Sequence, residues 1–342
     1  MRKATVQDLA ALAGVSTATV DRVLHNRSGV SDKARERVKA AIHELGFGQL
    51  PGDLMEAPKR TLRFLFLLPK VNTSFAKAIS ASVRAAARVS DDVHIINDIH
   101  RVDLRDNKEI IQELDDVTAD RYDGVALFAV DAPGVRQAMD RVVERGVKIV
   151  TVVSDIPTSK RHHFVGIDNV AAGRVAGTLM GRFVGKRKGT IGVIAGSLRM
   201  RDHVDRYFGF EQILHARFPS LRILPIEEGD SLHERNAVIT RRLLEKHDDL
   251  VGLYSAAAGN IGILEVLGDL GISDKLVVIM HELSEHVRAG LADGTVDAVI
   301  NQDTGHIARS AVRVLTAFCS GRPIIEAQEK IRIDIYLADN LP

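Results

Sequence analysis

The chain has 342 residues, 45% of them apolar and 27% charged, with 46 Lys and Arg against 45 Asp and Glu. This apolar fraction excludes wholesale disorder, and the near-zero net charge argues against a general polyanion binder. The single cysteine, Cys319, cannot form an internal disulfide. Because the N-terminus lacks a secretion-type apolar segment and no apolar run is long enough to cross a bilayer, we expect a cytoplasmic protein with no membrane partner.

The first 47 residues contain only helical patterns, and their caps and turn are typical of a helix-turn-helix. Thr5, with Asp8 three residues later, predicts the capped start of a first helix, which Gly14 ends in a left-handed turn. Ser16 is expected to cap a second helix, and a third helix follows Ser31. The fold needs a small residue where the helices cross, a glycine in the turn and an apolar residue to hold the second helix, and the chain has these at Ala10, Gly14 and Val20.

The second helix, at 17–25, is expected to enter the major groove of double-stranded DNA. Thr17, Ala18 and Arg22 would face base edges, with Arg22 as a bidentate partner for guanine. Further contacts, mainly to phosphates, are expected from Thr5, Ser16, Thr19, Asn26 and Ser31. Residues 1–60 hold ten Lys and Arg against seven acids, whereas the remainder holds 36 against 38, so the positive excess lies where DNA binding requires it. A three-helix docking module is the alternative.

Residues 48–60 (GQLPGDLMEAPKR) have the composition of a linker, and an alternation of strands and helices begins at Thr61. Eight apolar runs predict strands at 62–69, 93–98, 123–130, 147–153, 189–196, 250–256, 275–281 and 296–301. Helical patterns separate most of them, at 74–89, 133–145, 170–185, 204–217, 233–247, 260–270 and 304–319. Continuous apolar runs indicate strands covered on both faces, and therefore parallel α/β sheets in two lobes or a barrel.

The stretch TVQDLAALAGVSTATVDRVLHNRSGVSDKARERVKAAIHELGF resembles the headpiece of LacI/GalR-type bacterial transcription regulators. The resemblance implies a small all-α helix-turn-helix domain at 1–47, a hinge at 48–60 and a two-lobed, periplasmic-binding-protein-like α/β core at 61–342. In that fold, lobe 1 is expected to take 61–160 and 303–324, and lobe 2 is expected to take 161–302 and 325–342. The function implied is that of a homodimeric regulator, usually a repressor, that binds a palindromic operator under the control of a small sugar. No enzymatic activity, cofactor or metal is implied.

Two positions depart from the family pattern. Asp21 stands where the family usually has Ser, so it is expected either to orient Arg22 or to weaken a phosphate contact. In the hinge, Glu56 falls where the family has the Leu that wedges into the minor groove, so Leu54 or Met55 is expected to substitute for it.

Polar side chains that follow the predicted strands are the candidates for a ligand site, because open α/β sheets bind ligands at the carboxyl ends of their strands. Carboxylates, amides, an Arg and an aromatic face suit a polyhydroxylated ligand. The candidates are Asn72, Phe75, Asp131, Ser154, Asp155, Arg206, Asn260, Glu282 and Gln302. The resemblance separately supports Phe75, Arg206, Glu282 and Gln302, whereas Asn260 is a substitute for an Asn-Asp pair that the chain lacks. Asp168 and Asn169 are expected to be structural.

A dinucleotide-binding protein is the alternative from another class. Ala257, Gly259 and Gly262 form A-x-G-x-x-G after a predicted strand, and Glu282 follows at the spacing of a ribose-binding acid. This pattern predicts an NAD-sensing regulator or an oxidoreductase. Against it, an Ala replaces the first Gly, and it crowds the turn that a pyrophosphate needs. A transport-type solute-binding protein conflicts with the headpiece and with the absent secretion segment.

Overall fold

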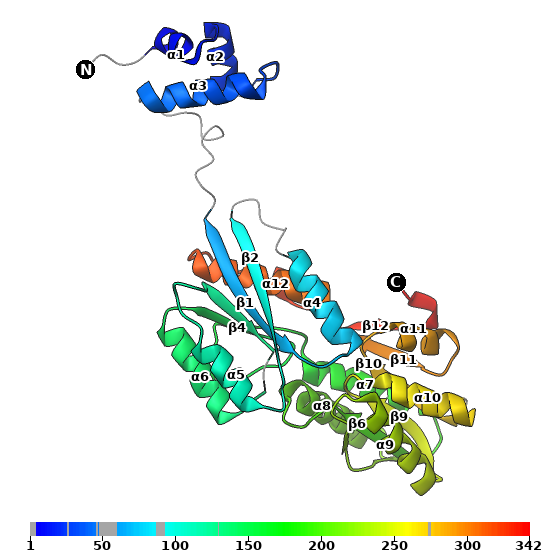
Figure 1. Ribbon diagram of the computed structural model, residues 1–342. Helices are drawn as coiled ribbons and strands as arrows, with labels where there is room; N and C mark the ends of the chain where they lie inside the picture. The colour runs from blue at the N-terminus through cyan, green and yellow to red at the C-terminus, as the bar shows by residue number, and fades with distance from the viewer. Residues whose placement is uncertain are drawn as a thin grey trace. The chain divides into compact units, whose positions relative to one another are not determined.

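The computed structural model describes residues 5–25, 27–45, 47, 60–86, 93–128, 130–272 and 275–342. The chain divides into two compact units, residues 1–60 and 61–342 (Figure 1). Within the described residues, no helix is long and apolar enough to span a bilayer.

The N-terminal unit is a three-helix bundle of α1 (Val6–Ala13), α2 (Thr17–Leu24) and α3 (Asp32–Leu45). The Thr5–Asp8 capping box forms as predicted, and Gly14 ends α1 at a φ of 61°. Ser16 caps α2 by accepting a hydrogen bond from the backbone of Thr19. Fully buried side chains from all three helices form the core of the bundle, among them Leu9, Val20, Val23 and Val38.

The first lobe of the larger unit is a parallel five-stranded sheet in the order β2-β1-β3-β4-β5. Its strands are β1 (Thr61–Pro69), β2 (His94–Val102), β3 (Gly124–Leu127), β4 (Lys148–Val152) and β5 (His163–Val165). Two pairs of helices enclose the sheet (Figure 1): α4 (Ser74–Ala86) with α12 (Thr304–Cys319), and α5 (Asn107–Asp115) with α6 (Pro133–Glu144).

The second lobe is a sheet in the order β12-β11-β10-β9-β6-β7, with β8 paired to β6. Its strands are β6 (Gly189–Ala195), β7 (Leu221–Ile223), β8 (Glu227–Glu228), β9 (Leu250–Ser255), β10 (Val277–His281), β11 (Ala298–Asn301) and β12 (Asp334–Tyr336). Its helices are α7 (Asn169–Val184), α8 (Arg201–Arg217), α9 (His233–Lys246), α10 (Asn260–Leu270) and α11 (Glu285–Ala292), and a 3₁₀ turn occupies Ala338–Asn340. The short α13 (Glu326–Glu329) packs on α12, where Arg313 donates to Glu329. Among the strands that the structure describes, only β12 runs antiparallel to its neighbour, so the predicted parallel sheets are correct apart from this edge strand.

Both faces of the second sheet are covered, which explains its continuous apolar runs. Along β10, Val277 and Ile279 join the cluster under α7 and α8, whereas Val278 and Met280 join the cluster under α9, α10 and α11. Successive strand residues point to opposite faces, so both sets must be apolar when both faces are buried.

The chain passes between the lobes three times: from β5 to α7, from β11 to α12, and from α12 to β12. The predicted lobe boundary at 160/161 is therefore too early, because β5 at 163–165 still belongs to the first sheet. All eight predicted strands form, but four shorter ones (β5, β7, β8 and β12) were not predicted, and neither were α5 and α11. The missed strands have only two or three residues and are not continuously buried, so they carry little apolar pattern.

Candidate functional site

A cleft of about 970 Å³, its open mouth included, lies between the two lobes. Residues at the carboxyl ends of strands in both sheets line it, as expected for open α/β sheets. Lobe 1 contributes Pro69, Phe75, Phe128 and Val153, and lobe 2 contributes Gly196, Arg206, Ala257 and Glu282. Gln302, in the crossover from β11 to α12, lines it as well.

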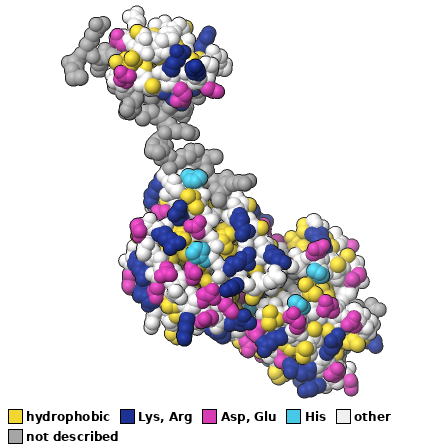
Figure 2. All heavy atoms as spheres, viewed as in Figure 1, with side chains coloured by type: hydrophobic (Ala, Val, Ile, Leu, Met, Phe, Trp, Pro, Cys, Tyr) yellow, Lys and Arg dark blue, Asp and Glu magenta, His cyan; other side chains and the backbone are white. Residues whose placement is uncertain are grey.

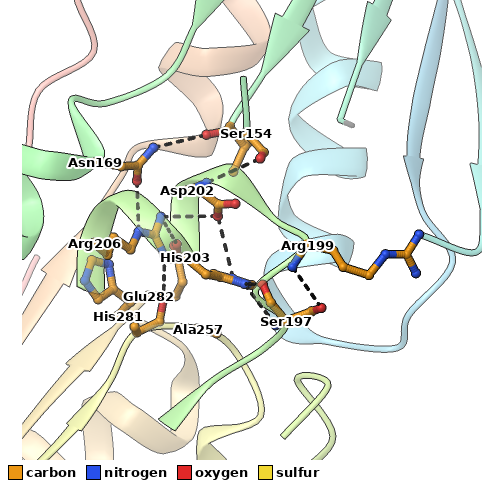
Figure 3. A network of polar contacts seen from close by, with 12 residues as sticks. Ser154, Asn169, Ser197, Arg199, Asp202, His203, Arg206, Ala257, His281 and Glu282 are labelled. Atoms are coloured by element: carbon orange, nitrogen blue, oxygen red, sulfur yellow. Dashed lines mark hydrogen bonds and ion pairs between the residues drawn. The ribbon is translucent and has the colours of Figure 1, made fainter. Parts of the chain in front are cut away.

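The guanidinium of Arg206 occupies the centre of the polar floor of this cleft (Figure 3). The residue is only 2% exposed. Its Nε donates to Oδ1 of Asn169 at 2.9 Å, and its Nη1 donates to the carbonyl oxygen of Ala256 at 2.9 Å. Nη2 lies 3.9 Å from a carboxylate oxygen of Asp202 and 3.9 Å from one of Glu282. One buried cation therefore faces two carboxylates, the pairing that a buried charge requires.

Close packing of α7 against α8 places Arg206 there. A Cβ on Gly173 of α7 would lie 2.0 Å from the carbonyl oxygen of Arg206, and one on Gly209 of α8 would lie 2.1 Å from that of Val170. Because any side chain at these two positions would push the helices apart, the glycines bring the α8 backbone against α7. The same contact brings Asn169, the first residue of α7, within hydrogen-bonding distance of the guanidinium.

Glu282 follows β10 in the left-handed backbone region, at a φ of 69°. Its Oε1 accepts a hydrogen bond of 2.8 Å from Nε2 of Gln302. Burial raises the pKa of its carboxyl to about 7, although Arg206 and Gln302 both act in the opposite direction. The group therefore titrates near neutral pH.

Backbone strain is concentrated around this cleft. Among the described residues, four non-glycine residues have a positive φ: Val153, Asp230, Ser231 and Glu282. All four line the cleft. Such conformations cost about 1–3 kcal/mol each and persist where the surrounding structure imposes them, often at ligand sites.

Three buried polar atoms around Arg206 have no hydrogen-bond partner among the described residues. They are Nη2 of Arg206, Oδ1 of Asp202 and Oε1 of Gln302. Each of these residues is 2% exposed and lines the cleft. Buried polar atoms are normally hydrogen-bonded, so an unpartnered donor beside two unpartnered acceptors indicates a place for a ligand or water.

Arg199 connects the two lobes at the mouth of the cleft. It follows β6 in lobe 2, and its guanidinium donates to the carbonyl oxygen of Arg105 at 3.2 Å and to Oδ1 of Asn107 at 2.5 Å in lobe 1. Figure 3 shows the side chain extending away from Arg206. This contact joins the two lobes without using the polar atoms around Arg206.

The structure brings together only some of the predicted site residues. Phe75, Arg206, Glu282 and Gln302 line the cleft, and Asn72 lines an adjoining groove. Asn260 also borders that groove, but it is 6% exposed and its amide is occupied by Ser255 at 2.6 Å and by the carbonyl of His281 at 2.9 Å.

The other three predicted residues do not line the cleft. Asp131 pairs with Arg136 at 2.8 Å, and Asp155 accepts hydrogen bonds from Arg161 and Thr151. Ser154 is fully buried beneath Asp202, whose backbone N–H points at its Oγ from 3.4 Å. The carboxyl ends of the strands mark the edge of the sheets at which the cleft lies. The conformation of the short turn after each strand decides which of the side chains there face the cleft.

Sequence reasoning missed Asp202. Asp202 lies one helical turn before Arg206, a spacing that places both side chains on one face of α8 and could have identified it. Asp168 caps α7, and Asn169 holds the guanidinium of Arg206 without lining the cleft, in keeping with the structural roles expected of both. His203 is 8% exposed and also lines the cleft.

In the N-terminal unit, Thr17, Ala18 and Arg22 are exposed along α2. The backbone carbonyl of Arg22 accepts a hydrogen bond from the backbone of Arg27, whereas its exposed guanidinium has neither a hydrogen bond nor an ion pair among the described residues. Asp21 does not orient it, because Asp21 pairs instead with Arg27 at 3.3 Å and His25 at 3.1 Å.

The predicted phosphate contacts of this unit have local partners. Thr5, Ser16 and Ser31 each accept a hydrogen bond from the backbone N–H three residues later, and Thr19 lies 2.9 Å from Ser16, oxygen to oxygen. Asn26, Leu54 and Met55 lie outside the described residues.

The A-x-G-x-x-G segment has a packing explanation. A Cβ on Gly262 would lie 1.9 Å from the carbonyl oxygen of His233, and one on Gly259 would lie 2.7 Å from the side chain of Asn236. Both glycines therefore accommodate α9 and the turn before it, which occupy the space that a pyrophosphate would need.

The chain matches two protein families in succession. Residues 5–48 match the bacterial regulatory proteins of the lacI family, and residues 64–323 match the periplasmic binding protein domain. A curated relative, the HTH-type transcriptional regulator CelR of Thermobifida fusca, is 26% identical over 97% of this chain and 95% of its own length. The HTH-type transcriptional repressor CytR of Escherichia coli K12 is 27% identical over 79% of each chain.

Among solved structures, the chain is similar to GanP, a glucose-galactose binding protein from Geobacillus stearothermophilus. The TM-score is 0.74 at 23% identity, and the match covers 83% of this chain and all of GanP. This likeness shows the fold of the two-lobed core. Neither family match supports the dinucleotide alternative.

Proposed function

The chain belongs to the LacI family of bacterial transcription regulators, with a DNA-binding helix-turn-helix and a periplasmic-binding-protein-like core, and from this premise we propose how its parts divide the work. Residues 1–47 bind DNA, residues 48–60 link them to the core, and residues 61–342 bind a sugar and pair with a second copy. The protein acts in the cytoplasm as a repressor whose operator affinity the sugar controls.

The observation that carries the effector proposal is the buried group around Arg206 in the cleft. One guanidinium, two carboxylates and an amide face the same space, and three of their atoms lack partners among the described residues. A sugar hydroxyl both donates and accepts, so adjacent hydroxyls can satisfy an acceptor and a donor together. GanP, which shares the core's fold, is named for binding glucose and galactose.

The position of the cleft between two lobes allows ligand binding to be coupled to DNA binding. It is bounded by two lobes joined by three crossovers, and one crossover contains Gln302. A ligand that contacts both lobes stabilises one lobe arrangement over others, and in a dimer this arrangement sets the spacing of the two headpieces. A differential affinity of about 1–3 kcal/mol between the two arrangements is sufficient for ordinary allosteric control.

The DNA-binding side rests on the exposed face of α2. One three-helix unit makes few base contacts, so two units are needed on the half-sites of a palindrome. Mixed charge on the core agrees with this division, because Figure 2 shows acidic and basic side chains interspersed over the face that it draws.

The test uses the full-length protein and has two stages. Selection from a random duplex pool should yield a palindromic sequence, and a panel of pentoses, hexoses, polyols and their phosphates should contain a compound that changes the affinity for it. Arg206→Met should lose the response to that compound while still binding the selected duplex. No preference for any duplex over random DNA, or a bound sugar that leaves operator affinity unchanged, would contradict the proposal.

A further inference from the structure

Polar side chains at the rim of the cleft are largely occupied by one another. Arg105 donates to Asp103 at 2.8 Å, and Arg199 donates to Asn107. Asp230 pairs with Arg235. The charges of Arg105 and Asp230 are therefore paired within the protein, and the guanidinium of Arg199 is engaged by neutral oxygens of lobe 1.

Buried polar atoms without a hydrogen-bond partner lie together on the floor. Among the buried side-chain atoms of the described cleft residues, Nη2 of Arg206 is the unpartnered donor, and Oδ1 of Asp202 and Oε1 of Gln302 are the unpartnered acceptors. The carboxylate of Glu282 stands between them, 3.9 Å from the guanidinium and 2.8 Å from the Gln302 amide. One donor and its neighbouring acceptors suffice for two adjacent hydroxyls of a sugar.

Apolar side chains from both lobes form a large part of the remaining wall. Phe75 and Phe128 stand edge to face, with ring centroids 6.4 Å apart, on the lobe 1 side. Val130 continues this surface, and Met200 and Ala257 face it from lobe 2. Ala257 and Ala258 follow β9, so methyl groups occupy the end of that strand as well.

We propose that the cleft selects a deoxy or methyl-substituted sugar, bound by two adjacent hydroxyls on the Arg206 floor, over the fully hydroxylated parent sugar. The inference rests on the proposed sugar-sensing function and narrows its ligand class. A hydroxyl directed at the apolar wall loses its water and gains no partner, whereas a hydrogen or methyl at the same position fits the wall without that loss.

The experiment is calorimetric titration of the full-length protein with matched pairs of sugars. The pairs are D-galactose with D-fucose, L-mannose with L-rhamnose, D-glucose with 6-deoxy-D-glucose and with 2-deoxy-D-glucose, and D-ribose with 2-deoxy-D-ribose. The tightest ligand of the panel should be a deoxy sugar, binding about tenfold more tightly than its parent. A parent sugar as the tightest ligand overturns the inference and leaves the proposed function standing. If no sugar binds, the proposed function itself fails.

Two variants that add a hydroxyl to the wall test where the selectivity arises. Val130→Thr preserves shape on the lobe 1 side, and Ala257→Ser adds one atom on the lobe 2 side. At least one of them should reduce the preference for the deoxy sugar severalfold, because the parent's hydroxyl gains a partner. Gln302→Met is the matched control on the floor: it should weaken both members of a pair and leave their ratio unchanged. An unchanged ratio in both wall variants, or a ratio altered by Gln302→Met, would contradict the assignment.

Discussion

Replacing Glu282 by Gln should remove a pH-dependent loss of stability from the ligand-free protein. Burial raises the pKa of this carboxyl from 4.5 to about 7 in the folded chain. Between these two values the folded chain holds a proton that the unfolded chain has released, so the free energy of unfolding falls as the pH rises through this window. A shift of this size corresponds to roughly 3 kcal/mol once both states are ionised.

The substitution keeps the shape of the side chain and the hydrogen bond from Gln302, but the new amide does not ionise, so no charge is buried. We therefore expect Glu282→Gln to match the wild type below about pH 4.5 and to be more stable by up to roughly 3 kcal/mol above about pH 8. The attraction to Arg206, 3.9 Å away, is already part of this figure, because it lowers the pKa that burial raises.

Urea unfolding of both proteins at a series of pH values measures the effect, and the difference curve cancels titrations that the two share. Glu285→Gln, which removes an exposed carboxyl three residues later, is the control and should follow the wild type to within about 0.5 kcal/mol. If the free energies of unfolding of Glu282→Gln and the wild type change in parallel between pH 4.5 and about pH 8, ionisation of Glu282 does not destabilise the folded chain, and the reasoning is refuted.

Three further substitutions test other parts of the structure. Arg22→Ala should reduce discrimination between the selected operator and random DNA by tenfold or more in fluorescence anisotropy, with sugar binding unchanged, because a bidentate base contact is worth about 1–3 kcal/mol; retained selectivity would exclude the groove assignment. Gly173→Ala should lower the free energy of unfolding by about 1–3 kcal/mol and weaken sugar binding, because the added Cβ would meet the α8 backbone. The control Gly268→Ala places its Cβ in open space and should leave the free energy of unfolding unchanged or raise it. Arg199→Ala should speed sugar dissociation severalfold in stopped-flow measurements by removing the contact between the lobes; Arg201→Ala, which removes an ion pair within α8, should not.

Local sequence patterns predicted the elements that depend on interactions between residues close together in the chain. The capping box at Thr5, the left-handed Gly14 and the cap at Ser16 all form, because each needs only residues within one turn of the chain. The eight long strands also form, because a strand buried on both faces must be apolar throughout. Strands of two or three residues carry no such pattern, so β5 was missed and the lobe boundary was placed too early.

For the ligand site, the sequence by itself determined the edge of the sheets at which it would lie, and it identified Arg206, Glu282, Gln302 and Phe75 among the residues that line it. Only the tertiary structure decided that Asp131 and Asp155 pair elsewhere, that Asp202 completes the floor and that Asn169 holds Arg206 in place. The physical reason is that a side chain's partner depends on distances across the fold: α7 and α8 approach through glycines, and that approach carries Arg206 to a carboxylate 76 positions further along the chain.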